Sequence, residues 1–295
     1  MANQGWRKKN GAKVRLAARR ATLIRQALRQ SVSISQVQED WASAQPNAES
    51  MTTEQARQWA RTNVRFNSEP LMAALRTLYS ESYLLGEDIA MNSISKAKID
   101  KAPTKQQLQR AVGINWDNWK AGNRAAALLV NKPRGLSTLL DNRGVTIQGI
   151  NRTTMDRIGT RLATALAQGL PPSEVDLSDF FDDSERALAI AQTEMSRAVA
   201  TASRELYEES GVELVEWIVA DPCDLCQENA DVSPIRIDDT FPSGDTEPPA
   251  HPNCVCDISP YVVDTRDIGE DAHRIFLMER INKWHLSTLI QAHKQ

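Results

Sequence analysis

All four cysteines of this 295-residue chain fall within one stretch of 34 residues, together with a histidine. They form the motifs Cys223-x-x-Cys226 and Cys254-x-Cys256, and His251 stands three places before Cys254. A tight Cys-x-x-Cys turn brings two thiolates to one side, and alternate residues of a strand share a face, so each motif presents its two sulfurs together. A structural zinc ion takes four tetrahedral nitrogen and sulfur ligands. The spacing therefore predicts a structural zinc site that uses four of these five groups.

Other uses of the cysteines are weighed against this prediction. The basic N-terminus is not followed by a continuous apolar segment, so we expect no secretory signal and reduced thiols, which disfavours two disulfides. No βαβ pattern surrounds the Cys-x-x-Cys motif, as a thioredoxin-like redox site would require. Free structural thiols remain an alternative. A catalytic zinc would need an open coordination position and a general base; Asp221 and Asp224 are near in sequence, but acids are common in solvated loops.

The charges are distributed unevenly, although the net charge is only -3. Residues 1–35 hold no acid, whereas residues 223–247 are strongly acidic. The basic side chains of the first segment are Arg7, Lys8, Lys9, Lys13, Arg15, Arg19, Arg20, Arg25 and Arg29. This segment is either an ordinary helix with a solvated charged face or a contact surface for DNA, for the surface of a membrane or for an acidic protein. No apolar run reaches the roughly 18–20 residues of a membrane span, so no membrane partner is expected.

The rest of the pattern is mainly helical. Much of the apolar content is Ala and Leu, and helical spacing of apolar residues recurs along the chain. We expect helices over residues 12–30, 52–66, from Pro70 through Ile89, 116–130, 135–140, 153–168, 184–210 and near the C-terminus. Strands are expected over 212–220 and from Cys254 onward. Residues 227–250, with four prolines, are predicted to form a long loop that burial cannot anchor and that needs a separate fastening, which the zinc would supply.

These elements predict a mainly α fold with a small C-terminal α+β subdomain stabilised by zinc. The predicted parts are a basic N-terminal arm, helix and linker (1–50), a helical domain (51–183), the zinc-containing subdomain (184–264) and a C-terminal helix (265–295).

A longer pattern links the cysteines to the helix before them. Ala191-x-Thr193-Glu194 on that helix precedes a strand, then the Cys-x-x-Cys motif and finally His-Pro-x-Cys-x-Cys. This order resembles the Mu F-like family of phage head morphogenesis proteins, closely over residues 184–258 and by helical layout over 70–183. Gln192 and Val255 stand where the family usually has Arg, and neither change removes a metal ligand. Glu194 and Arg197 form either an exposed ion pair or a contact that fixes the packing of the zinc subdomain.

The resemblance implies a non-enzymatic minor capsid protein of a tailed bacteriophage. Such a protein is made in the host cytoplasm and lies inside the virion near the portal vertex, where it aids head assembly or DNA packaging and delivery. Its expected partners are the portal protein and major capsid or scaffold components, and the basic segment is expected to contact either packaged DNA or the portal. A zinc-dependent nucleic-acid-processing enzyme is the alternative. A zinc-ribbon transcription or RNA-binding factor fits less well, because the residues around the cysteines are acidic.

Overall fold

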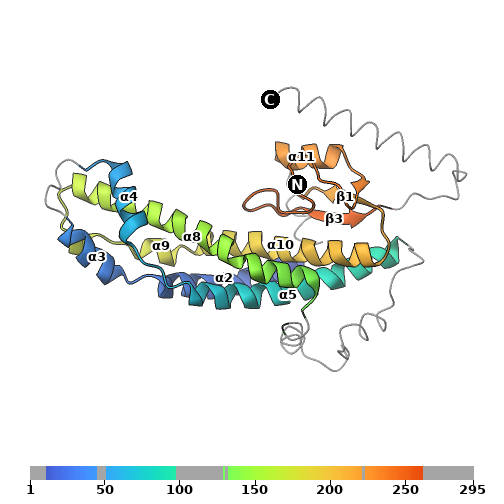
Figure 1. Cartoon of the computed structure of the whole chain (residues 1–295), viewed down its shortest axis with the longest axis horizontal. Helices are drawn as coiled ribbons and strands as arrows, with labels where there is room; N and C mark the ends of the chain where they lie inside the picture. Colours follow the sequence, from blue (N-terminus) through green and yellow to red (C-terminus); the bar gives the residue numbers. More distant parts are fainter. Residues whose placement is uncertain (1–10, 45–50, 98–128, 130–131, 221–222, 262–295) are drawn as a thin grey trace, which may run out of the picture. The chain divides into compact units, whose positions relative to one another are not determined.

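The computed structural model describes residues 11–44, 51–97, 129, 132–220 and 223–261 (Figure 1). These residues form a mainly helical chain with one small antiparallel sheet, as predicted. In chain order the elements are α2 (Gly11–Ser31), α3 (Ile34–Ser43), α4 (Thr53–Asn63), α5 (Glu69–Lys96), α8 (Arg134–Ala167), the 3-10 turn η3 (Pro172–Glu174), α9 (Asp179–Asp182), α10 (Ser184–Glu209), β1 (Leu214–Ile218), α11 (Asp224–Asp231), β2 (Ile235–Arg236) and β3 (Asp257–Pro260). The helices predicted over 116–130 and at the C-terminus lie outside the described residues, apart from residue 129.

Local sequence signals account for several helix ends. A capping box begins α4: the Thr52 side chain accepts from the backbone N–H of Gln55, and the Gln55 side chain accepts from the backbone N–H of Thr52. Gly211 follows α10 with φ of 73°, a left-handed conformation that glycine adopts without steric cost. One prediction is wrong: residues 135–140 and 153–168 belong to a single helix, α8. The interior glycines of α8 weaken the helix but do not break it, and buried side chains such as Ile147 hold its middle.

The described chain divides into two compact units. One comprises Arg15–Tyr79 and Ser137–Ala191, and the other comprises Met1–Val14, Ser80–Leu136 and Gln192–Gln295. The cysteines belong to the second unit. The four-part division predicted from the sequence stays a prediction.

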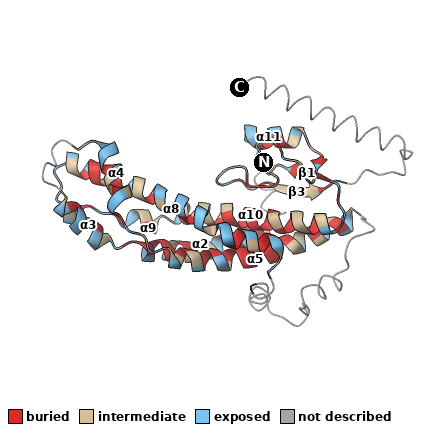
Figure 2. Cartoon of the chain, viewed as in Figure 1, coloured by how far each residue is buried: buried red, intermediate tan, exposed pale blue. Residues whose placement is uncertain are grey.

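Close helix packing shapes the unit that carries the cysteines. A Cβ atom at Gly86 of α5 would lie 2.4 Å from the carbonyl oxygen of Val199 on α10, so only glycine fits there. The Ser203 hydroxyl donates a hydrogen bond of 3.2 Å to the carbonyl of Gly86. Figure 2 shows the resulting band of buried residues along both helices. The two helices therefore pack closely at this interior glycine.

The sheet lies over the ends of these helices. Its strand order is β2-β1-β3, and both pairings are antiparallel. One continuous core joins helical and sheet residues with three of the cysteines: Ala90, Ile94, Leu206, Tyr207, Val212, Val215, Trp217, Cys226, Ile235, Phe241, Cys254, Cys256 and Ile258.

The segment 227–250 differs from its prediction. It contains most of α11 and all of β2, and it is anchored by its own buried side chains. The ring of Phe241 packs edge-on against Trp217 with the centroids 4.9 Å apart. The buried Asn229 side chain donates to the Ser243 hydroxyl and accepts from the Ser243 N–H, each at 3.0 Å. The expectation that this loop buries too little to anchor itself is corrected: Ile235, Phe241 and Asn229 are all buried.

Candidate metal centre

The register of the sheet brings the two cysteine motifs together. Ile218 at the end of β1 pairs with Asp257 at the start of β3. The chain reaches Cys223 soon after Ile218, and Cys256 immediately precedes Asp257. Cys223 is the N-cap residue of α11 and Cys226 lies in its first turn. Strand pairing thus places both motifs at one end of the sheet.

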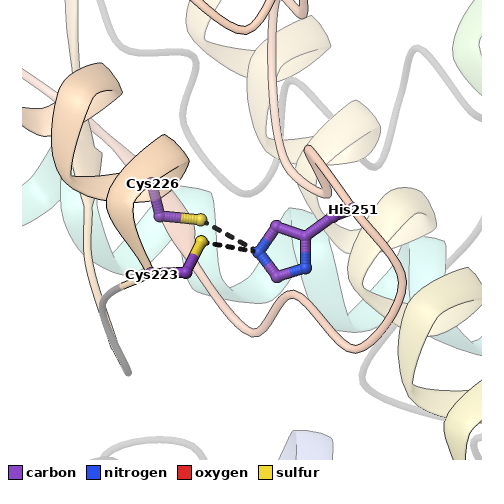
Figure 3. A group of neighbouring side chains, drawn as sticks. All are labelled: Cys223, Cys226 and His251. Atoms are coloured by element: carbon purple, nitrogen blue, oxygen red, sulfur yellow. Dashed lines mark hydrogen bonds between the residues drawn. The ribbon is translucent and has the colours of Figure 1, made fainter.

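Three distances between ligand atoms are close to those of a tetrahedral metal site. His251 Nε2 lies 3.2 Å from Cys223 Sγ and 3.3 Å from Cys226 Sγ (Figure 3). Cys226 Sγ lies 3.7 Å from Cys254 Sγ. With Zn–S of about 2.3 Å and Zn–N of about 2.0 Å, tetrahedral angles place ligand atoms roughly 3.5–3.8 Å apart. These three pairs of atoms are therefore spaced nearly as in a zinc site, and the five residues form two groups of three ligand atoms that share Cys226.

All five predicted ligands take part in two overlapping groups that share Cys226. Ligand atoms of Cys223, Cys226 and His251 lie within 4.8 Å of one another, and so do those of Cys226, Cys254 and Cys256. Cys226, Cys254 and Cys256 are buried, whereas Cys223 is exposed, and all four are free thiols. The residues predicted from the sequence could hold a metal ion at this point of the fold.

Hydrogen bonds around the centre prepare its groups for a cation. His251 Nδ1–H donates to the carbonyl of Pro252 at 2.8 Å, which leaves the Nε2 lone pair facing the sulfurs. That backbone hydrogen bond also raises the pKa of His251, which makes Nε2 a more basic ligand but also lets a proton compete more strongly with the metal. The backbone N–H of Cys226 donates to the sulfur of Cys223 and lowers the pKa of that thiol. A neutral imidazole and a thiolate are the forms in which these groups bind metal.

The buried thiols differ in their affinity for a proton. A hydrogen bond from Cys256 lowers the pKa of Cys254 to about 5, and the same interaction raises the pKa of Cys256. Burial raises the pKa of Cys226 to about 12. Three sulfurs this close cannot all carry a negative charge without a cation. A bound divalent metal would supply that cation and displace the remaining protons.

Helix α10 holds the turn that carries His251. Asn253 has φ of 63°, and its N–H donates to the Thr193 hydroxyl at 3.0 Å. The next residue of the helix, Glu194, has a side chain only 6% exposed and pairs with Arg197 at 3.4 Å. An exposed ion pair therefore does not describe Glu194. The contact at Thr193 favours the other interpretation, in which this part of α10 fixes the packing of the cysteine region.

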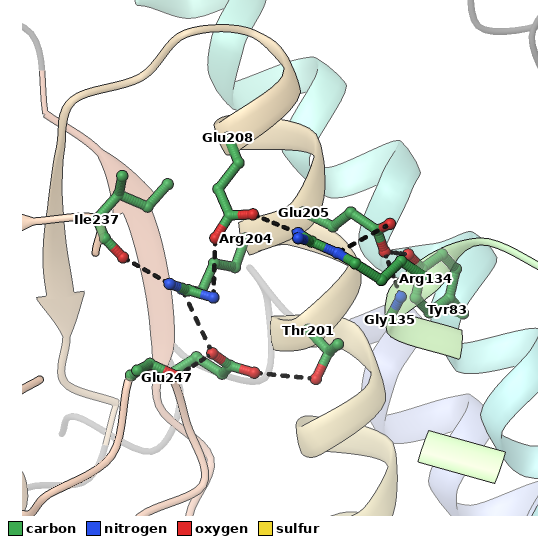
Figure 4. Close-up of polar contacts among 10 residues, drawn as sticks. Tyr83, Arg134, Gly135, Thr201, Arg204, Glu205, Glu208, Ile237 and Glu247 are labelled. Carbon is green, nitrogen blue, oxygen red and sulfur yellow. Dashed lines mark hydrogen bonds and ion pairs between the residues drawn. The ribbon is translucent and has the colours of Figure 1, made fainter. Parts of the chain in front are cut away.

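A second set of polar contacts ties the segment after β2 to α10 (Figure 4). Arg204 donates to the carbonyl of Ile237 at 2.7 Å and pairs with Glu208 at 2.8 Å and Glu247 at 3.6 Å. The Thr201 hydroxyl donates to Glu247 at 3.1 Å. Sequence reasoning missed the contacts with Ile237 and Glu247, because these two partners lie up to 46 positions from the residues on α10 and no local pattern connects them.

The basic residues predicted to contact nucleic acid or the portal differ in their exposure. Arg7, Lys8 and Lys9 lie outside the described residues. On α2, Arg15, Arg19 and Arg29 are exposed, and Arg20 and Arg25 are half-buried. The prediction for Lys13 is wrong: its side chain is 2% exposed and its ammonium group pairs with Asp257. An ammonium group enclosed in this way cannot reach a phosphate.

Comparisons with known proteins found no matching family model, no matching curated protein and no matching solved structure. Among the helices that the structure describes, none combines the length and apolar character needed to cross a membrane.

Proposed function

We propose that this chain is a structural minor capsid protein of a tailed bacteriophage, of the Mu F-like kind. The observation that carries the proposal is the contact between Thr193 and Asn253. Thr193 belongs to the Ala-x-Thr-Glu element and Asn253 to the His-Pro-x-Cys-x-Cys element of the pattern that resembles this family. The two residues are 60 positions apart in the chain. Their contact supports the proposal, because it joins the two elements of the family pattern in one folded unit.

The metal in this proposal is a structural zinc ion. The candidate donors are thiols and one imidazole, and the two groups of described residues contain no carboxylate. Thiolate and imidazole ligands suit zinc, whereas calcium and magnesium take oxygen ligands. Three of the four sulfurs are buried. Four protein ligands would close the coordination sphere, which is the arrangement of a structural site and not of a catalytic one.

In this role the protein acts through its surfaces. The zinc-bound subdomain and the helices dock on the portal protein and on capsid or scaffold components inside the head. The exposed arginines of α2, together with the basic residues before it, contact packaged DNA or the portal. The protein aids head assembly or DNA packaging and delivery without a chemical step of its own.

The direct test is to purify heads of the phage that encodes the chain and to measure its amount relative to the portal protein. We expect copurification at a few copies per head. The variant Cys226→Ser should be missing from heads, whereas Gln227→Ser, which changes the exposed neighbouring residue, should enter them normally. Absence of the wild-type protein from heads contradicts the proposal. Normal incorporation of Cys226→Ser into particles that are not infectious would favour a catalytic or DNA-delivery role for the site.

A further inference from the structure

Lys13 is an unusual residue for the interior of a protein. It lies in the first turn of α2, its side chain is 2% exposed, and its ammonium group donates to the carboxylate of Asp257. The Asp257 side chain is 23% exposed. A buried ammonium group without a partner destabilises a protein strongly. The pairing with Asp257 is therefore required for Lys13 to be buried, unlike an ion pair on the surface.

The position of Asp257 connects this ion pair to the cysteines. Asp257 is the first residue of β3 and immediately follows Cys256, whose ligand atom lies within 4.8 Å of those of Cys226 and Cys254. Whatever fixes Asp257 also fixes the direction in which the Cys256 sulfur points. The charge of Lys13 also offsets part of the negative charge that thiolates and this carboxylate bring to one small region.

We infer that Lys13 is a positioning residue of the metal centre, and that metal binding and the first turn of α2 stabilise each other through the ion pair between Lys13 and Asp257. This inference rests on the proposed metal centre and is independent of the role in the phage head.

Metal affinity of the full chain tests the first half of the inference. Zinc is titrated against a chromophoric chelator that competes for the ion. We expect Lys13→Met to weaken zinc binding by about 10–100-fold, the usual effect of removing a group that supports a metal ligand. Lys13→Arg keeps the positive charge and should retain most of the affinity. Arg15→Met is the matched control, because Arg15 is exposed and lies two residues further along the same helix.

Hydrogen exchange tests the second half. The amides of residues 15–18 donate to the carbonyls of residues 11–14 in an α-helix, so their exchange reports whether the first turn is formed. We expect removal of zinc to accelerate this exchange in the wild type and to have little further effect in Lys13→Met, since coupling between two events is reciprocal. Should Lys13→Met not fold, Lys13→Met/Asp257→Leu replaces both charges by apolar groups, which buried pairs often tolerate. This variant should fold and show no effect of zinc on the exchange.

The possible failures are distinguishable. If the wild type binds zinc but Lys13→Met binds it equally well, or if zinc leaves the exchange of residues 15–18 unchanged in the wild type, the inference is wrong and the metal centre stands. If the wild type binds no zinc, the metal centre fails and the inference fails with it. Incorporation of the wild-type protein into heads is measured separately and tests the proposed function, not the role of Lys13.

Discussion

Replacing Gly86 by alanine tests the helix packing on which the metal centre is built. In most helix interiors this change is favourable, because alanine is preferred over glycine by about 1 kcal/mol. Here the new Cβ atom would lie 2.4 Å from the carbonyl oxygen of Val199, about 1 Å closer than an ordinary contact of 3.4 Å, and 2.8 Å from the Cβ atom of Ala202. Both obstacles belong to α10 close to its backbone, so neither can rotate away and the two helices must separate.

The expected magnitude follows from two opposing terms. Overpacking of a well-filled core costs about 1–3 kcal/mol, and the helix preference returns about 1 kcal/mol. Gly86→Ala should therefore lower the free energy of unfolding by up to about 2 kcal/mol. Gly149→Ala is the matched control, since Gly149 lies in the interior of α8 with no atom within 4 Å of its new Cβ. The control should be stabilised by up to about 1 kcal/mol.

Urea unfolding followed by circular dichroism measures both variants under the same zinc concentration. The difference between the unfolding free energies of Gly149→Ala and Gly86→Ala gives the cost of overpacking. We expect this difference to be about 1–3 kcal/mol. If Gly86→Ala is as stable as Gly149→Ala, α5 and α10 are not packed as closely as the structure shows, and the support assigned to the metal centre is wrong.

Three further predictions concern the site, the basic face and the pH dependence of stability. Cys226→Ser should lose the metal and make residues 223–261 more sensitive to protease, whereas the unit without cysteines stays resistant; equal digestion of both units would contradict this. Replacing Arg15, Arg19 and Arg29 together by glutamine should weaken DNA binding. The slope of log affinity against log salt should fall in magnitude by up to about 3, at about 0.9 per phosphate contact. An unchanged slope would show that these arginines do not contact DNA phosphates. Burial raises the pKa of Glu87 to about 8 from an ordinary value of 4.5. The folded protein therefore favours the protonated side chain, and the free energy of unfolding is retained at low pH and falls as the pH rises towards the folded-state pKa. Glu87→Gln should therefore flatten the fall in stability between pH 5 and pH 8.5, and an unchanged fall in urea unfolding would refute this assignment.

Much of the cysteine region could be predicted because its signals are local. The spacing of the cysteines, the alternation of β1 and the apolar stripe of α10 are all visible within short windows of sequence. The five candidate ligands were found in this way, and the structure brings them together. The choice of four among the five depends on distances that the spacing does not contain.

The missed features depend on contacts between residues far apart in the chain. Lys13 and Asp257 are separated by 244 positions, so a helical wheel of α2 shows Lys13 only as one more basic residue. The anchoring of Phe241 was missed for the same reason, because its partner Trp217 lies on β1, outside the loop. The continuity of α8 was missed because residues 141–152 contain two glycines and only three apolar residues.

The metal content of the purified protein tests the central claim most directly. Zinc per chain is measured by elemental analysis under reducing conditions, and the ligands are identified by X-ray absorption at the zinc edge. We predict about one zinc ion per chain with four protein ligands, at least three of them sulfur at about 2.3 Å. Less than half an equivalent of metal, or a coordination sphere completed by water oxygen, would contradict a structural zinc centre in this protein.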